Sequence, residues 1–171
     1  GSFEVTMLDI TGAYCTFANS GIFVSPTAII KIEDREGSIL YEHKINESQR
    51  FNSDVIYSLV DMMKGVIKYG TGKSANLPRP VAGKTGTTSD YKDAWFIGFS
   101  PQLVCTTWVG NDDNKPMHKV TGGSIPAKIW ADFMVKALEK VVPIDFPRPS
   151  DAPLTKGGFH PENVSPDEKY K

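Results

Sequence analysis

The sequence lacks an excess of charge of either sign, since 19 Lys and Arg residues are offset by 20 Asp and Glu residues in a chain of 171. A nucleic-acid partner or a polybasic membrane contact needs a clear basic excess, so both kinds of partner are excluded. The sequence also lacks an apolar run of the about 18 to 20 residues that a transmembrane helix needs. Its first four residues show no signal-peptide pattern. What remains is the composition of one ordinary packed domain.

Cysteine and histidine are scarce as well. The two cysteines, Cys15 and Cys105, permit a single pairing, whereas disulfide-stapled domains carry more cysteines at closer spacing. We therefore interpret both as small buried core residues. None of His43, His118 and His160 has a second ligand at metal-binding spacing, so we expect no metal site and no cofactor.

Three segments have the apolar spacing of amphipathic helices. The first begins after Thr6, whose hydroxyl forms a capping box with the carboxylate three residues on, and it stops at residues 19–21. The second covers about residues 53–69, with its cap at 52–54, and the third runs from Ser124 to about residue 142.

Strand patterns occupy two other regions. Residues 27–43 alternate in polarity around a turn at 34–37, which predicts a β-hairpin with one buried face. Three strands follow at 81–88, 94–100 and 103–110, the last two joined so tightly that they pair antiparallel. These two are apolar on both faces, which is typical of central strands in a sheet covered by helices on each side.

These elements predict an α+β domain over residues 1–142, an antiparallel sheet packed with helices. Beyond it the composition changes, because half of the 12 prolines lie in residues 143–171, among few large apolar side chains. We expect that segment to be a tail or linker.

The residues with chemical content are Lys84-Thr85-Gly86-Thr87, on the first of the three strands. On a strand, Thr85 and Thr87 project to one face, while Lys84 points to the other face or along the edge. Gly86 removes a side chain where another backbone or a ligand approaches closely. Paired hydroxyls and a nearby ammonium suit a carboxylate, and an N–H at a sheet edge can polarise a carbonyl oxygen.

With its context, this motif resembles the third motif of the class A, bifunctional penicillin-binding proteins, which are serine acyl-transfer enzymes with S-x-x-K, S-x-N and K-T-G boxes. The resemblance covers about residues 3–142 and matches the C-terminal part of the transpeptidase domain. The tripeptide K-T-G alone is a weak signal, and its surroundings carry the match. The matching segments are Tyr69-Gly70-Thr71-Gly72, Ala82–Thr88, Asp93–Pro101, Trp108–Asp112 and Val120–Trp130.

The resemblance implies the penicillin-binding and serine β-lactamase-like transpeptidase fold. It also implies a reaction, in which a serine attacks the D-Ala-D-Ala carbonyl of a peptidoglycan stem peptide and the acyl group passes to an amine of a neighbouring strand. β-Lactams are trapped at the acyl stage. The implied location is the extracytoplasmic face of the bacterial cytoplasmic membrane.

Residue by residue, the resemblance implies that Lys84 keeps the second-box serine and the substrate carboxylate in a positive field. Thr85 and Thr87 would hydrogen-bond that carboxylate, and the Thr87 N–H would be half of the oxyanion hole. The implied catalytic residues are thus Lys84 and Thr87, and the implied substrate-binding residues are Thr85, Gly86, Thr87 and Thr88.

Two short segments match the patterns of the other two motifs, S-x-x-K and S-x-N. Ser89-Asp90-Tyr91-Lys92 matches S-x-x-K, but a nucleophile box needs a helix N-terminus, so we interpret this string as a polar turn between two strands. Ser74-Ala75-Asn76 matches S-x-N in a segment that we expect to be a loop. Nucleophile, general base and half of the oxyanion hole are therefore missing, and we expect this chain alone not to acylate.

We accordingly expect a fragment whose glycosyltransferase domain, membrane anchor and N-terminal transpeptidase elements have been cut away. Family sheets have a further strand beside the one at 103–110, so we expect an open edge there that pairs with the missing N-terminal part or with another copy. Two alternatives remain: a fragment of a DD-carboxypeptidase or β-lactamase, and a non-catalytic wall-binding module.

Overall fold

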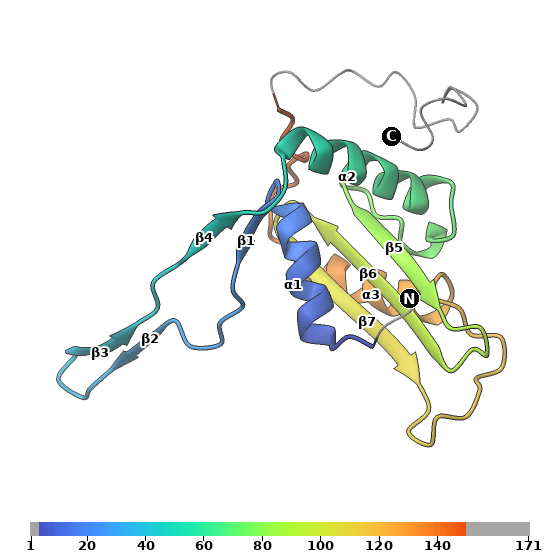
Figure 1. Ribbon diagram of the computed structural model, residues 1–171, viewed down its shortest axis with the longest axis horizontal. Coiled ribbons are helices and arrows are strands. Elements are labelled where there is room, and N and C mark those ends of the chain that lie inside the picture. Colours follow the sequence, from blue (N-terminus) through green and yellow to red (C-terminus); the bar gives the residue numbers. More distant parts are fainter. Residues whose placement is uncertain (1–3, 150–171) are drawn as a thin grey trace.

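The computed structural model describes residues 4–149. A three-stranded antiparallel sheet in the order β5-β6-β7 forms the centre, with helices on both faces, and a slender arm projects from one side (Figure 1). The sheet strands are β5 (Ala82–Thr87), β6 (Asp93–Ser100) and β7 (Leu103–Gly110). The predicted α+β class is confirmed, and so are these three strands, each within one residue at either end.

The helices on the first face begin where the sequence predicts a cap. The hydroxyl of Thr6 precedes α1 (Met7–Ala18) and accepts a hydrogen bond from the Asp9 N–H at 3.1 Å. The side chain of Asn52 does the same for α2 (Ser53–Lys68), where it accepts from the first backbone N–H groups of the helix. Both caps satisfy donors that have no partner inside the helix.

An apolar core lies on each face of the sheet. The core under α1 and α2 consists of Tyr14, Ile56, Val60, Met63, Ala82, Ile97, Phe99 and Phe146. On the opposite face, α3 (Ile125–Ala137) and the single 3-10 turn η1 (Lys73–Ala75) complete a second core around Trp130. The fully buried Trp130 donates its indole N–H to the carbonyl oxygens of Gly98 and Cys105, which joins α3 to β6 and β7.

The prediction of two central strands is correct for β6 alone. β6 is buried along almost its whole length and pairs on both sides. β7 pairs only with β6 and lies at the edge of the sheet, with α1 and α3 packed against it, so the open edge expected beside residues 103–110 is present. β7 is also less buried than β6, because Thr107 is its one buried residue and the others are half-buried or exposed.

The arm is one excursion of the chain between α1 and α2. At its base, β1 (Ile22–Val24) pairs antiparallel with β4 (Glu47–Gln49), and at its tip β2 (Lys31–Glu33) pairs with β3 (Ile39–Glu42). The predicted turn at the tip is confirmed, since Gly37 adopts a left-handed φ of 86° and donates its N–H to the carbonyl of the residue that opens the turn.

The predicted burial of one hairpin face is wrong. Every residue of β2 and β3 is exposed. The arm stands away from the body of the molecule, so no layer covers either of its faces (Figure 1). Alternating polarity distinguishes the two faces of a strand pair, but it does not supply the layer that would bury one of them.

The third helix ends at Ala137 and not near Val142 as predicted. After Ala137 the chain continues in tighter turns, in which the Val141 N–H donates to the Leu138 carbonyl oxygen, and the Arg79 guanidinium also donates to the carbonyl oxygens of Leu138 at 3.0 Å and Val141 at 3.1 Å. Leu138 and Val141 still pack against the second core, which preserves an apolar spacing that resembles a continuing helix.

Of the predicted tail, only residues 143–149 are described, and the remainder, with His160, lies outside the described residues. The described part forms no helix or strand, yet Phe146 is buried with its ring 5.5 Å from that of Phe99. Asp145 beside it forms an ion pair of 3.2 Å with Lys64 of α2. The chain that follows α3 therefore packs against the core shared by α1 and α2.

The two cysteines differ from their predicted burial. Cys15 is exposed on α1, so the prediction of a core residue is wrong there, whereas Cys105 is half-buried against the α3 core. Both are free thiols, and burial raises the pKa of the Cys105 thiol. Neither has the low pKa that marks a reactive cysteine.

Candidate functional site

The predicted site lies on an edge strand. β5 carries Lys84-Thr85-Gly86-Thr87 and pairs only with β6, so no described strand occupies its outer side. α2 lies across the beginning of β5, and the motif follows further along the strand (Figure 1). Thr87 is exposed and Thr85 is half-buried, so neither threonine is enclosed in the packed interior.

The direction of one backbone donor follows from the hydrogen bonding of β5. The Thr88 N–H donates to the Asp93 carbonyl oxygen at 3.0 Å, toward β6. Because N–H groups alternate in direction along a strand, the Thr87 N–H is directed away from β6. It therefore faces the outer side of the sheet, where the oxygen of a bound molecule can accept it.

Two loops set the hydrogen bonds of the threonine hydroxyls. Thr85 Oγ1 lies 2.7 Å from Thr71 Oγ1, in the loop after α2, and Thr87 Oγ1 accepts the Gly122 N–H at 3.0 Å, from the loop before α3. A hydroxyl that accepts a hydrogen bond still has its own hydrogen to donate. Thr87 is thus left as a donor toward any carboxylate that approaches.

The loop before α3 lies so close to β5 that it requires glycine. A Cβ on Gly122 would lie 2.6 Å from the Gly86 oxygen and 2.8 Å from the Gly86 nitrogen, and closer still to the Trp95 carbonyl oxygen. A Cβ on Gly123 would likewise clash with the Thr71 carbonyl oxygen. Three segments that are far apart in sequence therefore meet at this end of β5.

The Lys84 side chain bends along β5, and its ammonium group lies at the outer edge of that strand. Lys84 lies opposite Ile97 in the register, on the face away from the two threonines, and is exposed. Its Nζ donates to the Thr85 carbonyl oxygen at 2.8 Å. Since the C=O and N–H of Thr85 point the same way as those of Thr87, the ammonium is held at the outer edge. One cation, one N–H and two hydroxyls thus gather along one edge.

Sequence reasoning missed Thr71 and Gly122 as members of this site. It used the Gly-Thr-Gly and Gly-Gly strings around them only as context for the resemblance. Glycines next to a hydroxyl were the available signal, since they mark close backbone approach. The partner of each, Thr85 or Thr87, is 14 or 35 residues away, so no local pattern links them.

The two imitating strings have structural roles. Ser89–Lys92 is a turn between β5 and β6, where Tyr91 is left-handed and the Thr88 hydroxyl accepts the N–H groups of Lys92 and Asp93. The interpretation of this string as a polar turn is confirmed. Ser74-Ala75-Asn76 overlaps η1, a single 3-10 turn inside the predicted loop. Neither string opens an α-helix.

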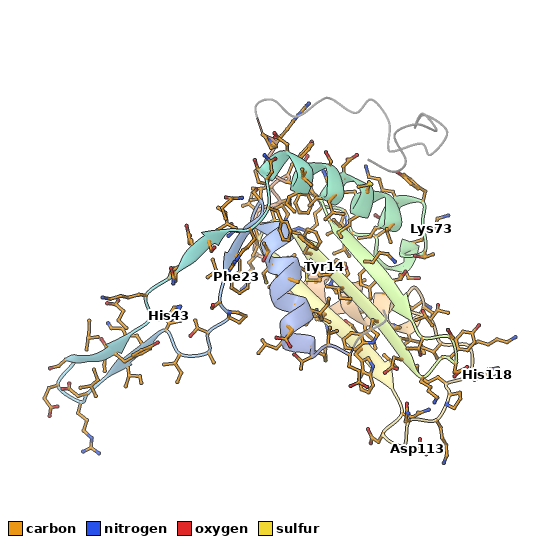
Figure 2. The ribbon with its side chains drawn as sticks, in the orientation of Figure 1. Tyr14, Phe23, His43, Lys73, Asp113 and His118 are labelled. Carbon is orange, nitrogen blue, oxygen red and sulfur yellow. The ribbon has the colours of Figure 1, made fainter. Side chains whose placement is uncertain are left out.

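A pocket and two histidines that could also belong to a functional site lie away from the Lys84–Thr87 motif of β5. A pocket of about 260 Å³ opens near Val81, at the other end of β5, and is lined by Lys64, Lys68 and Arg79 among others. Residues 4–149 contain no group of three or more His, Cys, Asp or Glu that could hold a metal ion. Figure 2 shows His43 on the arm and His118 on the loop after β7, on opposite sides of the molecule.

A comparison with protein families identifies the family of this chain. Residues 1–135 match the family model described as the penicillin binding protein transpeptidase domain. Among curated proteins, penicillin-binding protein 1A of Aquifex aeolicus is 41% identical over 145 residues, which cover 84% of this chain and 20% of that protein. The chain therefore spans about a fifth of the length of this relative.

Two solved structures of PonA1 from Mycobacterium tuberculosis have the same fold. The penicillin-binding protein alone has a TM-score of 0.82 and 28% identity, over 93% of this chain and 44% of that chain. Its complex with penicillin V has a TM-score of 0.80 and 29% identity, over the same shares. The structural match thus covers a larger share of this chain than the family match over residues 1–135.

Proposed function

The chain belongs to the penicillin-binding protein transpeptidase family, and we propose that it forms one wall of the active-site cleft of a peptidoglycan DD-transpeptidase. The resemblance to the C-terminal part of the class A transpeptidase domain is confirmed. The observation that carries the proposal is the outer edge of β5, where the Lys84 ammonium, the Thr87 N–H and the hydroxyls of Thr85 and Thr87 gather.

In this proposal the edge binds the C-terminal end of a stem peptide. The carboxylate accepts hydrogen bonds from the Thr85 and Thr87 hydroxyls, and the Lys84 ammonium supplies a positive field. The scissile carbonyl oxygen accepts the Thr87 N–H, which is half of an oxyanion hole worth about 3 kcal/mol of barrier per donor. Gly86 lets the peptide approach the backbone, and Thr88 holds the end of β5 through its turn.

The remaining chemistry requires groups on other polypeptide. A serine must attack the carbonyl carbon and release the terminal D-Ala, with its proton taken by a general base, and an amine of a neighbouring strand must then accept the acyl group. β-Lactams undergo only the first step, so they remain attached to the serine as the acyl-enzyme. The only S-x-x-K string of the described residues is the turn at Ser89–Lys92, so we propose that the chain alone does not acylate.

We also infer that the full-length protein is longer than this chain. It would carry a peptidoglycan glycosyltransferase domain and a membrane anchor, and would act at the extracytoplasmic face of the cytoplasmic membrane. Support comes from the likeness to penicillin-binding protein 1A, of which this chain covers 20%. No helix among residues 4–149 has the length and apolar character needed to cross a bilayer.

The outer edge of β7 is the place where we propose that the rest of the transpeptidase joins. β7 pairs with β6 on one side only, while α1 and α3 cover its faces. An unpaired edge on a strand that is packed between helices is a template for a further strand. That strand would come from the preceding polypeptide.

Labelling with a fluorescent penicillin tests the proposal. The chain alone should show no covalent band after denaturation, because the nucleophile is missing. The same chain with its upstream polypeptide restored should label, and the restored protein carrying Lys84→Ala should label much more slowly. A covalent band from the chain alone would overturn our interpretation of Ser89, and full labelling of the Lys84→Ala protein would remove β5 from the site.

A further inference from the structure

The tip of the arm presents an unusual amount of apolar side chain to solvent. Seven large apolar residues between positions 29 and 45 are 44% to 72% exposed: Ile29, Ile30, Ile32, Ile39, Leu40, Tyr41 and Ile45. A two-stranded ribbon on its own is marginally stable in water. Clustered exposed apolar residues on a protein surface mark an interaction site. The arm therefore resembles a part of a larger sheet whose further strand is missing.

The outer edge of β2 is the side available for pairing. Ile30 accepts the His43 N–H and Asp34 donates to Ser38, so these residues direct their backbone groups toward β3. By alternation, Lys31 and Glu33 direct their N–H and C=O groups outward, away from β3. The register shift between the two strands falls at the level of Ile32 and Glu33, where β3 has one more residue than β2. β2 is thus the regular edge of the pair.

We propose that β2 is a self-recognition strand, which pairs antiparallel with β2 of a second copy about a two-fold axis at Ile32. This register places Lys31 of each copy opposite Glu33 of the other, so the two outward-facing residues exchange backbone hydrogen bonds. The same pairing brings an ammonium opposite a carboxylate twice, and opposite charges on facing strands stabilise the pair.

Two of the seven exposed apolar residues, Ile32 and Tyr41, fit the same register. Ile32 lies opposite Tyr41 within the arm, and the two-fold axis brings Ile32 of the partner against the other side of Ile32. A four-residue row, Tyr41 and Ile32 from each copy, then crosses the combined sheet. Pairs at non-hydrogen-bonded positions have the closest side chains, so these exposed residues become each other's cover.

A second copy is favoured over an unrelated partner because Lys-Ile-Glu is its own complement under two-fold symmetry. An isologous interface requires the same patch to match itself, and a strand with two like charges could not do so. In the single chain, Lys31 Nζ lies 2.5 Å from Glu33 Oε1 on the same face. Pairing converts this exposed contact into a square of two ammonium and two carboxylate groups.

Reversing the charge at Lys31 or at Glu33 gives the first test. The oligomeric state of the full chain is measured by analytical ultracentrifugation at about 100 µM. The unmodified chain should form dimers. Lys31→Glu leaves two carboxylates on each β2, and Glu33→Lys leaves two ammonium groups, so each variant should associate at least about tenfold more weakly. Both positions are exposed, so folding is not at risk. A monomeric unmodified chain, or dimers unaffected by either change, would overturn the proposal.

Mixing separates pairing between chains from the ion pair within one chain. An equimolar mixture of the Lys31→Glu and Glu33→Lys chains should form heterodimers, because each carboxylate then faces an ammonium of the other chain. The double variant K31E/E33K should recover the unmodified dimer. If the mixture stays as weakly associated as its components, the effect belongs to the single chain and the proposed register is wrong.

A cross-link and a control variant locate the interface. With Cys15→Ser, the variant Ile32→Cys should form a disulfide-linked dimer under mild oxidation, since residues facing each other on the axis have Cα atoms about 4.5 Å apart. Val109→Lys, which places a charge at the β7 edge, should leave the dimer intact. Loss of the dimer in Val109→Lys with retention in Lys31→Glu would assign the association to β7 and overturn the proposal.

Discussion

At the scale of single residues, the site depends on a hydroxyl whose role is fixed by a backbone donor. Gly122 donates to Thr87 Oγ1, which leaves the Thr87 hydrogen for a carboxylate. In the transpeptidase with its upstream polypeptide restored, Thr87→Val should therefore slow acylation by a fluorescent penicillin about 10- to 100-fold, the loss of one hydrogen bond to a charged group. Thr87→Ser, which keeps the hydroxyl, should retain most of the rate. Equal losses in both variants would contradict this role.

The close approach of Gly122 to β5 predicts that a single methyl group added at position 122 lowers the stability of the fold. Gly122→Ala would place a Cβ 2.6 Å from the Gly86 oxygen, against backbone that cannot move without distorting β5. We expect a loss of about 1 to 3 kcal/mol in the free energy of unfolding, as for other overpacked sites. Urea denaturation measures it.

Gly12→Ala serves as the control for that substitution. Gly12 lies inside α1, and the nearest atom to an added Cβ is Pro26 Cγ at an ordinary 3.6 Å. Alanine is the better helix former by about 0.5 to 1 kcal/mol, so this variant should be unchanged or slightly more stable. A Gly122→Ala chain as stable as the Gly12→Ala chain would show that the loop before α3 is not locked against β5.

At the scale of elements, one ion pair ties the segment after α3 to α2. Burial raises the pKa of Asp145, but the Phe146 N–H and the Lys64 ammonium outweigh it and hold that pKa below its ordinary value. A lowered pKa contributes stability above the unfolded value near 3.9, and this contribution is lost as pH falls through the folded pKa. Asp145→Asn should therefore cost about 0.5 kcal/mol at pH 7, the size of an exposed ion pair.

The pH dependence distinguishes this ion pair from a simple packing effect. In urea denaturation, the difference between Asp145→Asn and the unmodified chain should shrink on acidification and vanish below the folded pKa. Asp113→Asn is the matched control, because Asp113 also pairs with a lysine, Lys115, but lies in a fully exposed loop. The hydrogen bonds to Lys115 also lower the Asp113 pKa, so Asp113→Asn should show the same fading in acid, but with a smaller effect at pH 7 because both partners are well exposed. A difference for Asp145→Asn that persists in acid would contradict the electrostatic explanation.

The elements also show which structural information is local. The caps at Thr6 and Asn52 and the glycine of the hairpin turn act within a few residues, so sequence patterns located α1, α2 and the tip of the arm. Burial of the arm, the end of α3 and the pairing of β1 with β4 depend on segments that are distant in sequence. Alternation could not show that the arm has no cover, and apolar spacing could not show that the helical turns of α3 give way to tighter turns after Ala137.

The site divides in the same way. The K-T-G string singles out Lys84, Thr85 and Thr87 through a family resemblance, and their role as site residues stays a prediction, whereas their strand was recognisable from its neighbours. The direction of the Thr87 N–H and the hydrogen bonds from Thr71 and Gly122 arise only when three segments meet. Hydrogen bonds between residues that are 14 or 35 positions apart do not produce a repeating pattern in the sequence, so they could not be predicted from it.

At the scale of the whole molecule, the sheet has three strands and two uncovered edges, and our proposals give them different uses. The β5 edge would stay open for substrate, whereas the β7 edge would be filled by the preceding polypeptide. Amide hydrogen exchange can separate these uses, because a backbone N–H is protected only when it is bonded and inaccessible.

We expect the outward N–H groups of β7 to exchange rapidly in this chain as a monomer and at least about 100-fold more slowly once the upstream polypeptide is restored. The N–H groups of β6, bonded on both sides in either case, should be protected in both. The Thr87 N–H should exchange rapidly in both and become protected only when a β-lactam acylates the restored protein, since its acceptor is then the lactam-derived oxygen. Protection of Thr87 before acylation, or of the outward β7 amides in the monomer, would show that the edge concerned is already occupied.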